Sequence, residues 1–417
     1  MINYKVHTLK NRLRFIEAPN QNTEAVTIFI QVGVGGRFEN NQQKGISHFL
    51  EHLFFKGSKN RPTTFEIVKE LDSIGANYNA FTGEECTGFF VQSEARDFEK
   101  SFAVISDMYL NPLFDEKELE REKGVILQES NMYRDMPQAF VQILNQRQMF
   151  GDHPLGYDLV GDQEHIKKIQ RSDIVSYREK YYLPENTIVA ITGNSKNANW
   201  QKTIEKHFSE INGTKATKPL EFSDQKVKEK LVGEVRKVDQ THFVLSYLSI
   251  KKTDPKRYAL GVLNTLLGGG MSSRLFMEIR EKRALAYYVK SSTADFLDTG
   301  LFSIYAGVKP EALQETIKII FDQIEDIKKN GPNKEELERA KGNLRGSLAI
   351  SLEDSLEIAG FLADELYYQD KIRSVSEIVE AVDKVSAQEI RDLANDVFVK
   401  DKMGLAVIGP RKYEITL

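Results

Sequence analysis

The feature that most constrains the fold is an internal repeat, in which the second half of the chain follows the same order of segments as the first. Residues 118–124 read ELEREKG, and residues 336–342 read ELERAKG. Each of these segments follows a proline-containing turn, an amphipathic stretch and a strand-like run. Each half also ends on a short apolar segment before a glycine, at 186–193 and at 403–409. Similar segments in the same order indicate two domains of similar fold.

The length of the chain agrees with this division, because 417 residues are more than one ordinary hydrophobic core accommodates. The polar stretch 209–225 lacks apolar periodicity and marks the joint. We therefore predict two domains, 1–215 and 216–417. Strands and helices mix in both halves, which indicates an α+β fold with a mostly antiparallel sheet and helices packed on it in each domain. The predicted strands are 12–17, 25–34, 87–93, 187–192, 242–249, 287–294, 300–307 and 403–408, and the predicted helices are 46–56, 64–74, 95–110 and 115–134, with counterparts in the second half.

Composition and charge disfavour several classes of partner. The 57 basic and 61 acidic residues give a net charge of -4, which does not favour binding to nucleic acid or to a membrane surface. No apolar run approaches the roughly 18 residues that a membrane-spanning helix needs. The N-terminal segment lacks the apolar core of a secretory signal, and the single cysteine, Cys86, cannot form a disulfide within the chain. These features favour a soluble cytoplasmic protein, with a mature form that has lost its leader as the alternative.

A candidate metal site lies in the pentapeptide HFLEH at residues 48–52. The segment 46–56 has the apolar spacing of an amphipathic helix, so His48 and His52 lie on one face together with Glu51. Two imidazoles at this spacing can bind one metal ion, and a carboxylate between them can reach a metal-bound water. H-x-x-E-H is the inverted zinc-peptidase signature, and a random match in a chain of this composition has a probability of about 0.02. The alternative is an exposed helix with two surface histidines.

A catalytic zinc site also needs a third protein ligand and an open position for water. Glu122 and Glu129 lie seven residues apart on the predicted helix 115–134, so both face the same way. One of them can bind the metal while the other orients a ligand or the water. Two glutamates on a Glu-rich helix are otherwise usually solvated surface. The repeat favours the metal site, because the corresponding residues of the second half, Ala340 and Ser347, lack carboxylates, and no second H-x-x-E-H occurs there.

Together these residues resemble the pitrilysin/insulinase family of inverted zinc metallopeptidases over essentially the whole chain. The likeness is greatest to the short two-domain branch, which includes the mitochondrial processing peptidase β subunit and its bacterial relatives. In the family pattern, 76 residues separate the motif from a glutamate ligand, and another glutamate lies seven residues before that ligand. Here 76 residues separate His52 from Glu129, and Glu122 lies seven residues before Glu129. The resemblance implies one Zn²⁺ per chain, bound by His48, His52 and Glu129. It also implies that Glu51 is the general base and that Glu122 orients the bound groups.

The resemblance further points to Asn79 and Ala80, which match a family pair on a sheet edge beside the metal. An extended peptide can add to such an edge as a further strand, so that backbone hydrogen bonds hold many different sequences. Without the family context, the segment containing this pair is typical of a turn rich in Asn and Gly. We therefore expect Asn79 and Ala80 to bind the substrate backbone.

Arg280 and Tyr287 match the signature that this family carries in its second half, an arginine followed seven residues later by a tyrosine. The resemblance implies that they bind the scissile carbonyl and the substrate backbone, where their donors would stabilise the developing oxyanion. The alternative is that Arg280 is only a surface residue of a helix and Tyr287 only a residue of a strand, with no part in binding. Nearby Arg283 and Tyr288 make the choice ambiguous, although the spacing favours Arg280 with Tyr287.

The resemblance also implies how the protein assembles. In the long members of the family, four similar domains form a closing shell, with the zinc site on the first domain and the Arg/Tyr pair on the last. A two-domain chain corresponds to half of this clamshell chamber. Because this chain carries both signatures, we expect a homodimer in which Arg280 and Tyr287 of one subunit complete the zinc site of the other, with a heterodimer as the alternative. The expected activity is a zinc-dependent endopeptidase that cleaves unfolded peptides or leader segments inside the chamber.

Two alternatives to a peptidase are a noncatalytic assembly subunit of the same fold and a peptide-binding module with a structural zinc. Loss of zinc ligands is typical of the first alternative, and none is missing here. A closed structural site needs a fourth protein ligand. The other histidines show no suitable spacing for that ligand: His7, His153, His165, His207 and His242.

Overall fold

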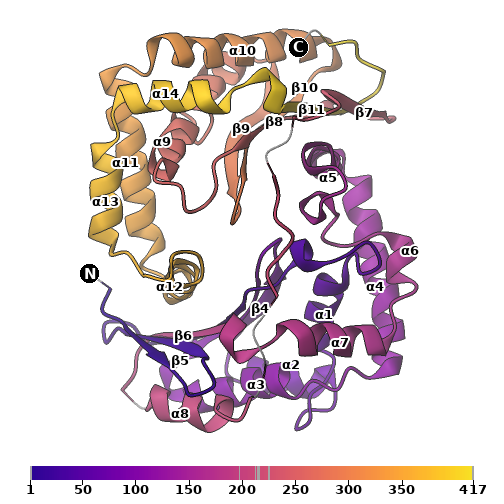
Figure 1. Ribbon diagram of the computed structural model, residues 1–417, viewed down its shortest axis with the longest axis vertical. Helices are drawn as coiled ribbons and strands as arrows, with labels where there is room; N and C mark the ends of the chain where they lie inside the picture. The colour runs from indigo at the N-terminus through magenta and orange to yellow at the C-terminus, as the bar shows by residue number, and fades with distance from the viewer. Residues whose placement is uncertain (1, 197, 212, 214–216, 224–225, 416–417) are drawn as a thin grey trace. The chain divides into compact units, whose positions relative to one another are not determined.

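The computed structural model describes residues 2–196, 198–211, 213, 217–223 and 226–415. Contacts within the chain divide it into two compact units (Figure 1). The first unit contains Met1–Asn131, Tyr157–Leu220 and Ile350–Ser374. The second unit contains Met132–Gly156, Glu221–Ala349 and Val375–Leu417.

These units are not continuous halves of the chain, which differs from the predicted division into 1–215 and 216–417. The predicted joint, 209–225, contains Leu220, which is one of the points where the chain leaves the first unit. Helix α5 (Pro137–Phe150) nevertheless belongs to the second unit, and helix α12 (Ser355–Gln369) belongs to the first. Each half of the sequence therefore contributes one helix to the unit that the other half mainly builds.

Hydrophobic burial explains this exchange of helices. Helix α5 buries Val141 against residues of the second unit's sheet, which are Val244, Ala406 and Ile408. Helix α12 buries its apolar face against the first unit's sheet, in a cluster that includes Ile16, Ala18, Phe29, Ile188, Ala190, Ile358, Ala359, Leu362, Ala363 and Leu366. Burial of apolar area is the dominant favourable term in folding. It can therefore place a helix on a sheet that is built mainly from the other half of the sequence.

The first unit is built on a six-stranded sheet in the order β1-β2-β6-β3-β5-β4, in which only β2 and β6 are parallel neighbours. Alternating residues of one strand point to opposite faces. Phe89 accordingly contacts Phe54 of helix α1 (Ile46–Phe54), whereas Phe90 packs against the cluster under α12. Different helices therefore cover the two faces. The strands are β1 (Lys5–Thr8), β2 (Arg14–Pro19), β3 (Ala25–Val32), β4 (Asn77–Thr82), β5 (Thr87–Glu94) and β6 (Thr187–Gly193).

The first unit also contains further helical segments. Helix α4 begins in the first unit, and its last turn belongs to the second. The segments are η1 (Gly36–Phe38), α2 (Thr64–Asp72), η2 (Ala95–Asp97), α3 (Phe98–Leu110), α4 (Glu116–Asp135), α6 (Gln163–Ile166), α7 (Arg171–Tyr181), η4 (Pro184–Asn186) and α8 (Trp200–Phe208).

The second unit repeats this topology in a five-stranded sheet with the order β7-β11-β8-β10-β9. Its one parallel pair, β7 with β11, corresponds to β2 with β6, and its edge strand β9 corresponds to β4. The predicted fold class, two similar α+β domains with mostly antiparallel sheets, is confirmed. The strands are β7 (Leu231–Val235), β8 (Thr241–Ser249), β9 (Ala286–Asp295), β10 (Gly300–Val308) and β11 (Met403–Gly409).

One large hydrophobic cluster forms the core of the second unit, between its sheet and its helices. Leu263, Ile320 and Leu393, from three different helices, are fully buried in it beside Phe302 of the sheet. The helical segments are η3 (Pro154–Gly156), α9 (Arg257–Leu267), η5 (Phe276–Glu281), η6 (Pro310–Ala312), α10 (Leu313–Asn330), α11 (Lys334–Ser351), α13 (Val375–Lys384), α14 (Ala387–Val397) and η7 (Lys400–Lys402). Among the helices that the structure describes, none combines the length and apolar composition that crossing a bilayer demands.

The strands that the sequence patterns missed, β1, β4 and β7, all lie at a sheet edge. The residues of β4 alternate between exposed and half-buried, and β1 and β7 are also largely exposed. An edge strand needs few apolar residues because one side of it faces solvent, so it produces only a weak hydrophobic pattern.

Candidate metal centre and substrate strand

Helix α1 presents the candidate metal ligands. Its inner face is fully buried, whereas His48, Glu51 and His52 form a half-buried stripe on the other side. This division follows from the helical period, because residues three and four apart share one face. The fully buried residues are Ile46, Phe49, Leu50, Leu53 and Phe54.

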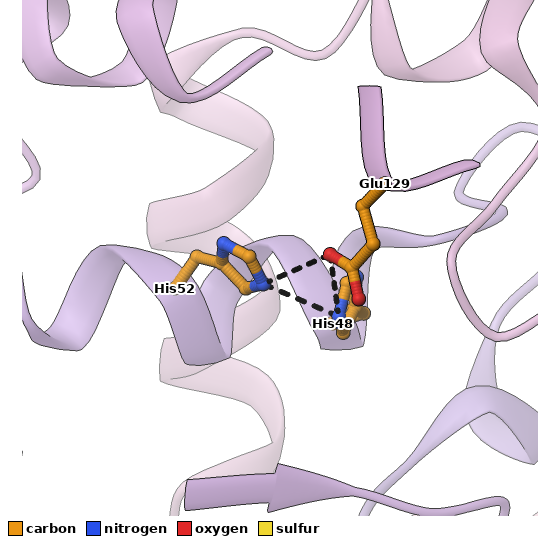
Figure 2. A group of neighbouring side chains, drawn as sticks. All are labelled: His48, His52 and Glu129. Atoms are coloured by element: carbon orange, nitrogen blue, oxygen red, sulfur yellow. Dashed lines mark hydrogen bonds and ion pairs between the residues drawn. The ribbon is translucent and has the colours of Figure 1, made fainter. Parts of the chain in front are cut away.

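His48, His52 and Glu129 converge on one point, as Figure 2 shows. The Nε2 atoms of the two histidines lie 3.2 Å apart. The Oε2 atom of Glu129, on α4, lies 3.7 Å from the Nε2 atom of His48 and 3.6 Å from that of His52. Tetrahedral zinc with ligands about 2.0–2.1 Å away holds them about 3.3–3.4 Å apart, so this donor set fits zinc. Two imidazoles and one carboxylate are also the ligand set of several catalytic zinc sites.

Glu122 lies two helical turns before Glu129 on α4 and contacts one of the two histidines. Its Oε1 atom lies 2.9 Å from Nδ1 of His52, and its Oε2 atom lies 2.8 Å from Nζ of Lys56. Burial alone would raise the pKa of Glu122, but the hydrogen bonds with His52 and Lys56 bring it below its usual value. An ionised carboxylate accepts hydrogen bonds, so Nδ1 of His52 carries the proton and Nε2 keeps its lone pair for a metal.

Glu51 lies between the two histidines in sequence and faces the strand β4. Its Oε2 atom accepts a hydrogen bond of 2.5 Å from the hydroxyl of Thr82. Burial raises the pKa of the Glu51 carboxyl, the charge of Glu129 acts in the same direction, and Thr82 and His52 oppose the shift. A carboxylate with a raised pKa is a better proton acceptor at neutral pH, which suits a general base.

Asn79 and Ala80 lie on β4, at the edge of the first unit's sheet. They pair with Phe90 and Phe89 of β5 on one side. No strand in the described part of the chain pairs with the other side of β4. The sheet-edge position that the resemblance implied is therefore present, in the same strand as Thr82, which hydrogen-bonds Glu51.

Tyr287 lies on β9, the edge strand of the second unit's sheet, and its side chain is 55% exposed. Gly307 of β10 pairs with Tyr288, but the next residue, Val308, pairs with Ala286, so Tyr287 is the extra residue of a β-bulge. Bulges re-aim a side chain and are frequent beside functional sites.

Arg280 lies in the π-helical segment η5, with its guanidinium 5.0 Å from the ring of Phe276. Short π-helical segments are rare and frequently occur at functional sites. The neighbouring candidates have other partners: Arg283 forms an ion pair with Glu278, and the Tyr288 hydroxyl lies 3.0 Å from Nδ1 of His242. No side-chain hydrogen bond or ion pair joins Arg280 to any other described residue, and the same holds for Tyr287.

Lys56 and Thr82 belong to this site but were not predicted. Lys56 lies four residues after His52, which is the spacing of neighbours on one helix face. This spacing could have indicated from the sequence that Lys56 lies beside the histidines. Thr82 ends the strand that carries Asn79 and Ala80. Its contact with Glu51 depends on how α1 packs against β4, so the sequence carries no local signal for it.

Comparisons with known proteins agree with this geometry. A family model described as Insulinase (Peptidase family M16) matches residues 14–163, and one described as Peptidase M16 inactive domain matches residues 168–344. A protein of Streptomyces coelicolor named an uncharacterized zinc protease is 34% identical over 412 residues, which are 97% of this chain and 89% of that protein. The uncharacterized zinc protease YmxG of Bacillus subtilis is 33% identical over 410 residues, which are 97% of this chain and 98% of that protein.

Solved structures agree with this chain in fold. A protease from Helicobacter pylori matches with a TM-score of 0.89 and 26% identity, covering 98% of this chain and 100% of that chain. A structure described as a peptidase M16 inactive domain from Pseudomonas fluorescens has a TM-score of 0.91, covers 100% of both chains and is 20% identical, which shows a shared fold. With relatives above 30% identity over almost its whole length, this chain belongs to peptidase family M16, the insulinase family, as its motifs predicted.

Proposed function

We propose that the protein is a zinc-dependent endopeptidase that hydrolyses peptide bonds in unfolded peptides or leader segments. The observation that carries this proposal is the convergence of two imidazole Nε2 atoms and a carboxylate oxygen at separations of 3.2, 3.6 and 3.7 Å, with Glu51 beside them. The relatives named zinc proteases support the same chemistry.

In this mechanism, His48, His52 and Glu129 would hold one zinc ion per chain. Zinc bound there would polarise a water molecule and the substrate carbonyl. Glu51 accepts the proton of the attacking water and later passes it to the leaving amine. Glu122 keeps His52 in the tautomer whose Nε2 faces the metal.

The substrate in this proposal lies extended along the outer edge of β4. Asn79 and Ala80 hold its backbone by strand addition, which selects for unfolded segments over folded proteins. Arg280 and Tyr287 donate hydrogen bonds to the carbonyl oxygen as negative charge develops on it. This arrangement serves processing and degradation equally well.

We further propose that the protein acts as a homodimer, in which Arg280 and Tyr287 of one subunit reach the zinc site of the other inside a closed chamber. Support comes from the family resemblance and from the exposure of Tyr287 on a bulged edge strand. A cytoplasmic location agrees with the single cysteine, Cys86, since a reducing compartment disfavours disulfides.

The test combines the zinc content of the purified protein with chelator-sensitive cleavage of an unstructured peptide. We expect about one zinc per chain, cleavage that stops on chelation, and recovery on adding zinc. A noncatalytic assembly subunit of the same fold would show no cleavage in zinc-loaded protein, and that result would overturn the proposal. Cleavage that resists chelation and metal removal would overturn it as well.

A further inference from the structure

Two buried residues with ionisable side chains, Arg37 and Glu39, stand two positions apart in the segment Gly36–Glu39. Arg37 is 1% exposed and Glu39 is 3% exposed. Burying a charged side chain is costly unless hydrogen bonds and opposite charges compensate for the lost water. The hydrogen-bond partners of these two residues therefore show which parts of the fold are joined to this segment.

Glu39 holds the start of the metal-binding helix. Its two carboxyl oxygens accept hydrogen bonds from the backbone N–H groups of Gly45, at 2.8 Å, and Ser47, at 2.9 Å. Helix α1 has glycine at its N-cap, with a φ of 87°, so no side chain there can satisfy the first N–H groups. Glu39 supplies the missing acceptors directly before His48. Burial raises the pKa of Glu39 to about 8, and carboxyl oxygens accept such bonds in either protonation state.

Arg37 holds the turn that follows the substrate strand β4. Its Nη1 atom donates a 2.6 Å hydrogen bond to Oε1 of Glu85, which is 3% exposed. Its backbone N–H donates to the carbonyl oxygen of Glu84 at 2.8 Å, and that of Gly36 donates to Gly83 at 3.1 Å. The turn between β4 and β5 is therefore fastened to the same short segment that caps α1.

We propose that Arg37 and Glu39 are positioning residues that align the metal-binding helix α1 with the substrate strand β4. This inference rests on the proposed function. Neither residue contacts the predicted ligands, yet a peptide on β4 reaches the metal and Glu51 only if α1 and β4 keep their mutual placement. A displacement of about 1 Å at a catalytic group can lower the rate about 100-fold.

The first experiment separates alignment from general stability by using the cobalt-substituted protein. Glu39→Met keeps the volume of the side chain but removes both acceptors. We expect it to change the visible absorption spectrum of bound cobalt and to lower kcat about 10-fold or more. Glu39→Gln keeps one carbonyl acceptor, so its cobalt spectrum and kcat should lie between those of the wild type and Glu39→Met. It replaces Glu39→Met in the test if that variant fails to fold.

The matched control is Glu365→Met. Glu365 is also buried in the first unit, at 9% exposure, and accepts a hydrogen bond of 2.7 Å from Nε of Arg373, away from α1 and β4. It should lower the melting temperature but leave the cobalt spectrum and kcat unchanged. If the Glu39 variants changed only the melting temperature, as this control does, the alignment role would be wrong.

Glu85→Gln tests the other end of the segment. Weakening its bond with Arg37 should raise KM several-fold for an unstructured peptide while the cobalt spectrum stays unchanged, because β4 shifts and α1 does not. An unchanged KM would overturn the Arg37 part of the inference. A wild-type protein that binds cobalt but cleaves nothing would refute the proposed function, while the spectra of the Glu39 variants would still decide whether Glu39 sets the metal ligands.

Discussion

The two units of this protein share one sheet topology but differ in what they place on it. Helix α4 of the first unit and helix α11 of the second contain the matching segments ELEREKG and ELERAKG. Leu119 and Leu337 are buried at equivalent places, as are Lys123 and Lys341. Burial at equivalent places in both units indicates that these shared residues take part in packing the scaffold.

The carboxylates of Glu122 and Glu129 on α4 are not shared between the units. The counterpart of Glu122 is Ala340, which packs in the apolar core of the second unit, and the counterpart of Glu129 is Ser347, which is exposed. A fold that is stable with alanine and serine at these places does not require glutamate there. This difference between the units supports the proposed roles of Glu122 and Glu129 in a metal site, and exchanging residues between the units tests those roles.

The largest effect is expected from Glu129→Ser, which gives the first unit the residue of the second. Two imidazoles alone bind zinc much more weakly than the complete set of three ligands, so zinc content should fall far below one per chain and cleavage should become undetectable. Metal analysis and circular dichroism measure the loss and the retained fold. The matched change in the second unit, Ser347→Ala, should alter neither quantity. Full zinc content in Glu129→Ser would show that Glu129 is not a ligand.

Glu51→Gln should have the next largest effect, because it removes the proposed base and keeps the proposed metal ligands. We expect kcat to fall about 100- to 10,000-fold with zinc content unchanged. The measurement is steady-state cleavage of an unstructured peptide, with Glu338→Gln on α11 as a control that retains activity. Normal turnover by Glu51→Gln would exclude it as the base.

Tyr287→Phe tests the proposed part of Tyr287 in binding the scissile carbonyl. Loss of one donor to the developing oxyanion should lower kcat about 100- to 1,000-fold. Tyr288→Phe removes the hydroxyl that lies near His242 and should affect mainly stability, by about 1 kcal/mol. If Tyr288→Phe lost more activity than Tyr287→Phe, the assignment of the pair would have to be reversed.

The same variant tests assembly. Glu51→Gln and Tyr287→Phe chains are each expected to be nearly inactive, and a mixed dimer would contain one intact site if the pair acts across subunits. Recovery of part of the activity on mixing supports a shared site. No recovery, with subunit exchange demonstrated by labelled chains, would argue for sites completed within one chain.

Glu122→Ala gives the first unit the alanine that the second unit has at this place. Of the exchanges at the proposed site, it should have the smallest effect on zinc affinity and activity. The loss of a partner behind a metal ligand typically lowers metal affinity or activity about 10- to 100-fold. Competition with a chelator of known affinity measures the effect on zinc. Lys56→Met, which removes the other partner of Glu122, should have a smaller effect in the same direction. A zinc affinity equal to that of the wild type would leave Glu122 with no role in the site.

Much of the fold was predictable because its signals are local. The central strands β3, β5, β6, β8, β10 and β11 have long apolar runs, and their predicted bounds agree with the structure to within about two residues. His48, Glu51 and His52 share a helix face by their spacing alone. The polar edge strands β1, β4 and β7 lacked such runs and were missed.

The sequence by itself determined the two similar domains, the shared helix face of His48, Glu51 and His52, and the two glutamates on one face of α4, because helical and strand periods repeat over a few residues. Only the tertiary structure decided that α5 and α12 exchange units, that Thr82 meets Glu51, and that Arg37 and Glu39 fasten the start of α1 and the turn after β4 to one segment. Each of these contacts joins residues far apart in the chain or on different elements. Their partners are chosen by the burial of apolar surface and by the need to satisfy buried polar groups, and neither choice leaves a periodic pattern in the sequence.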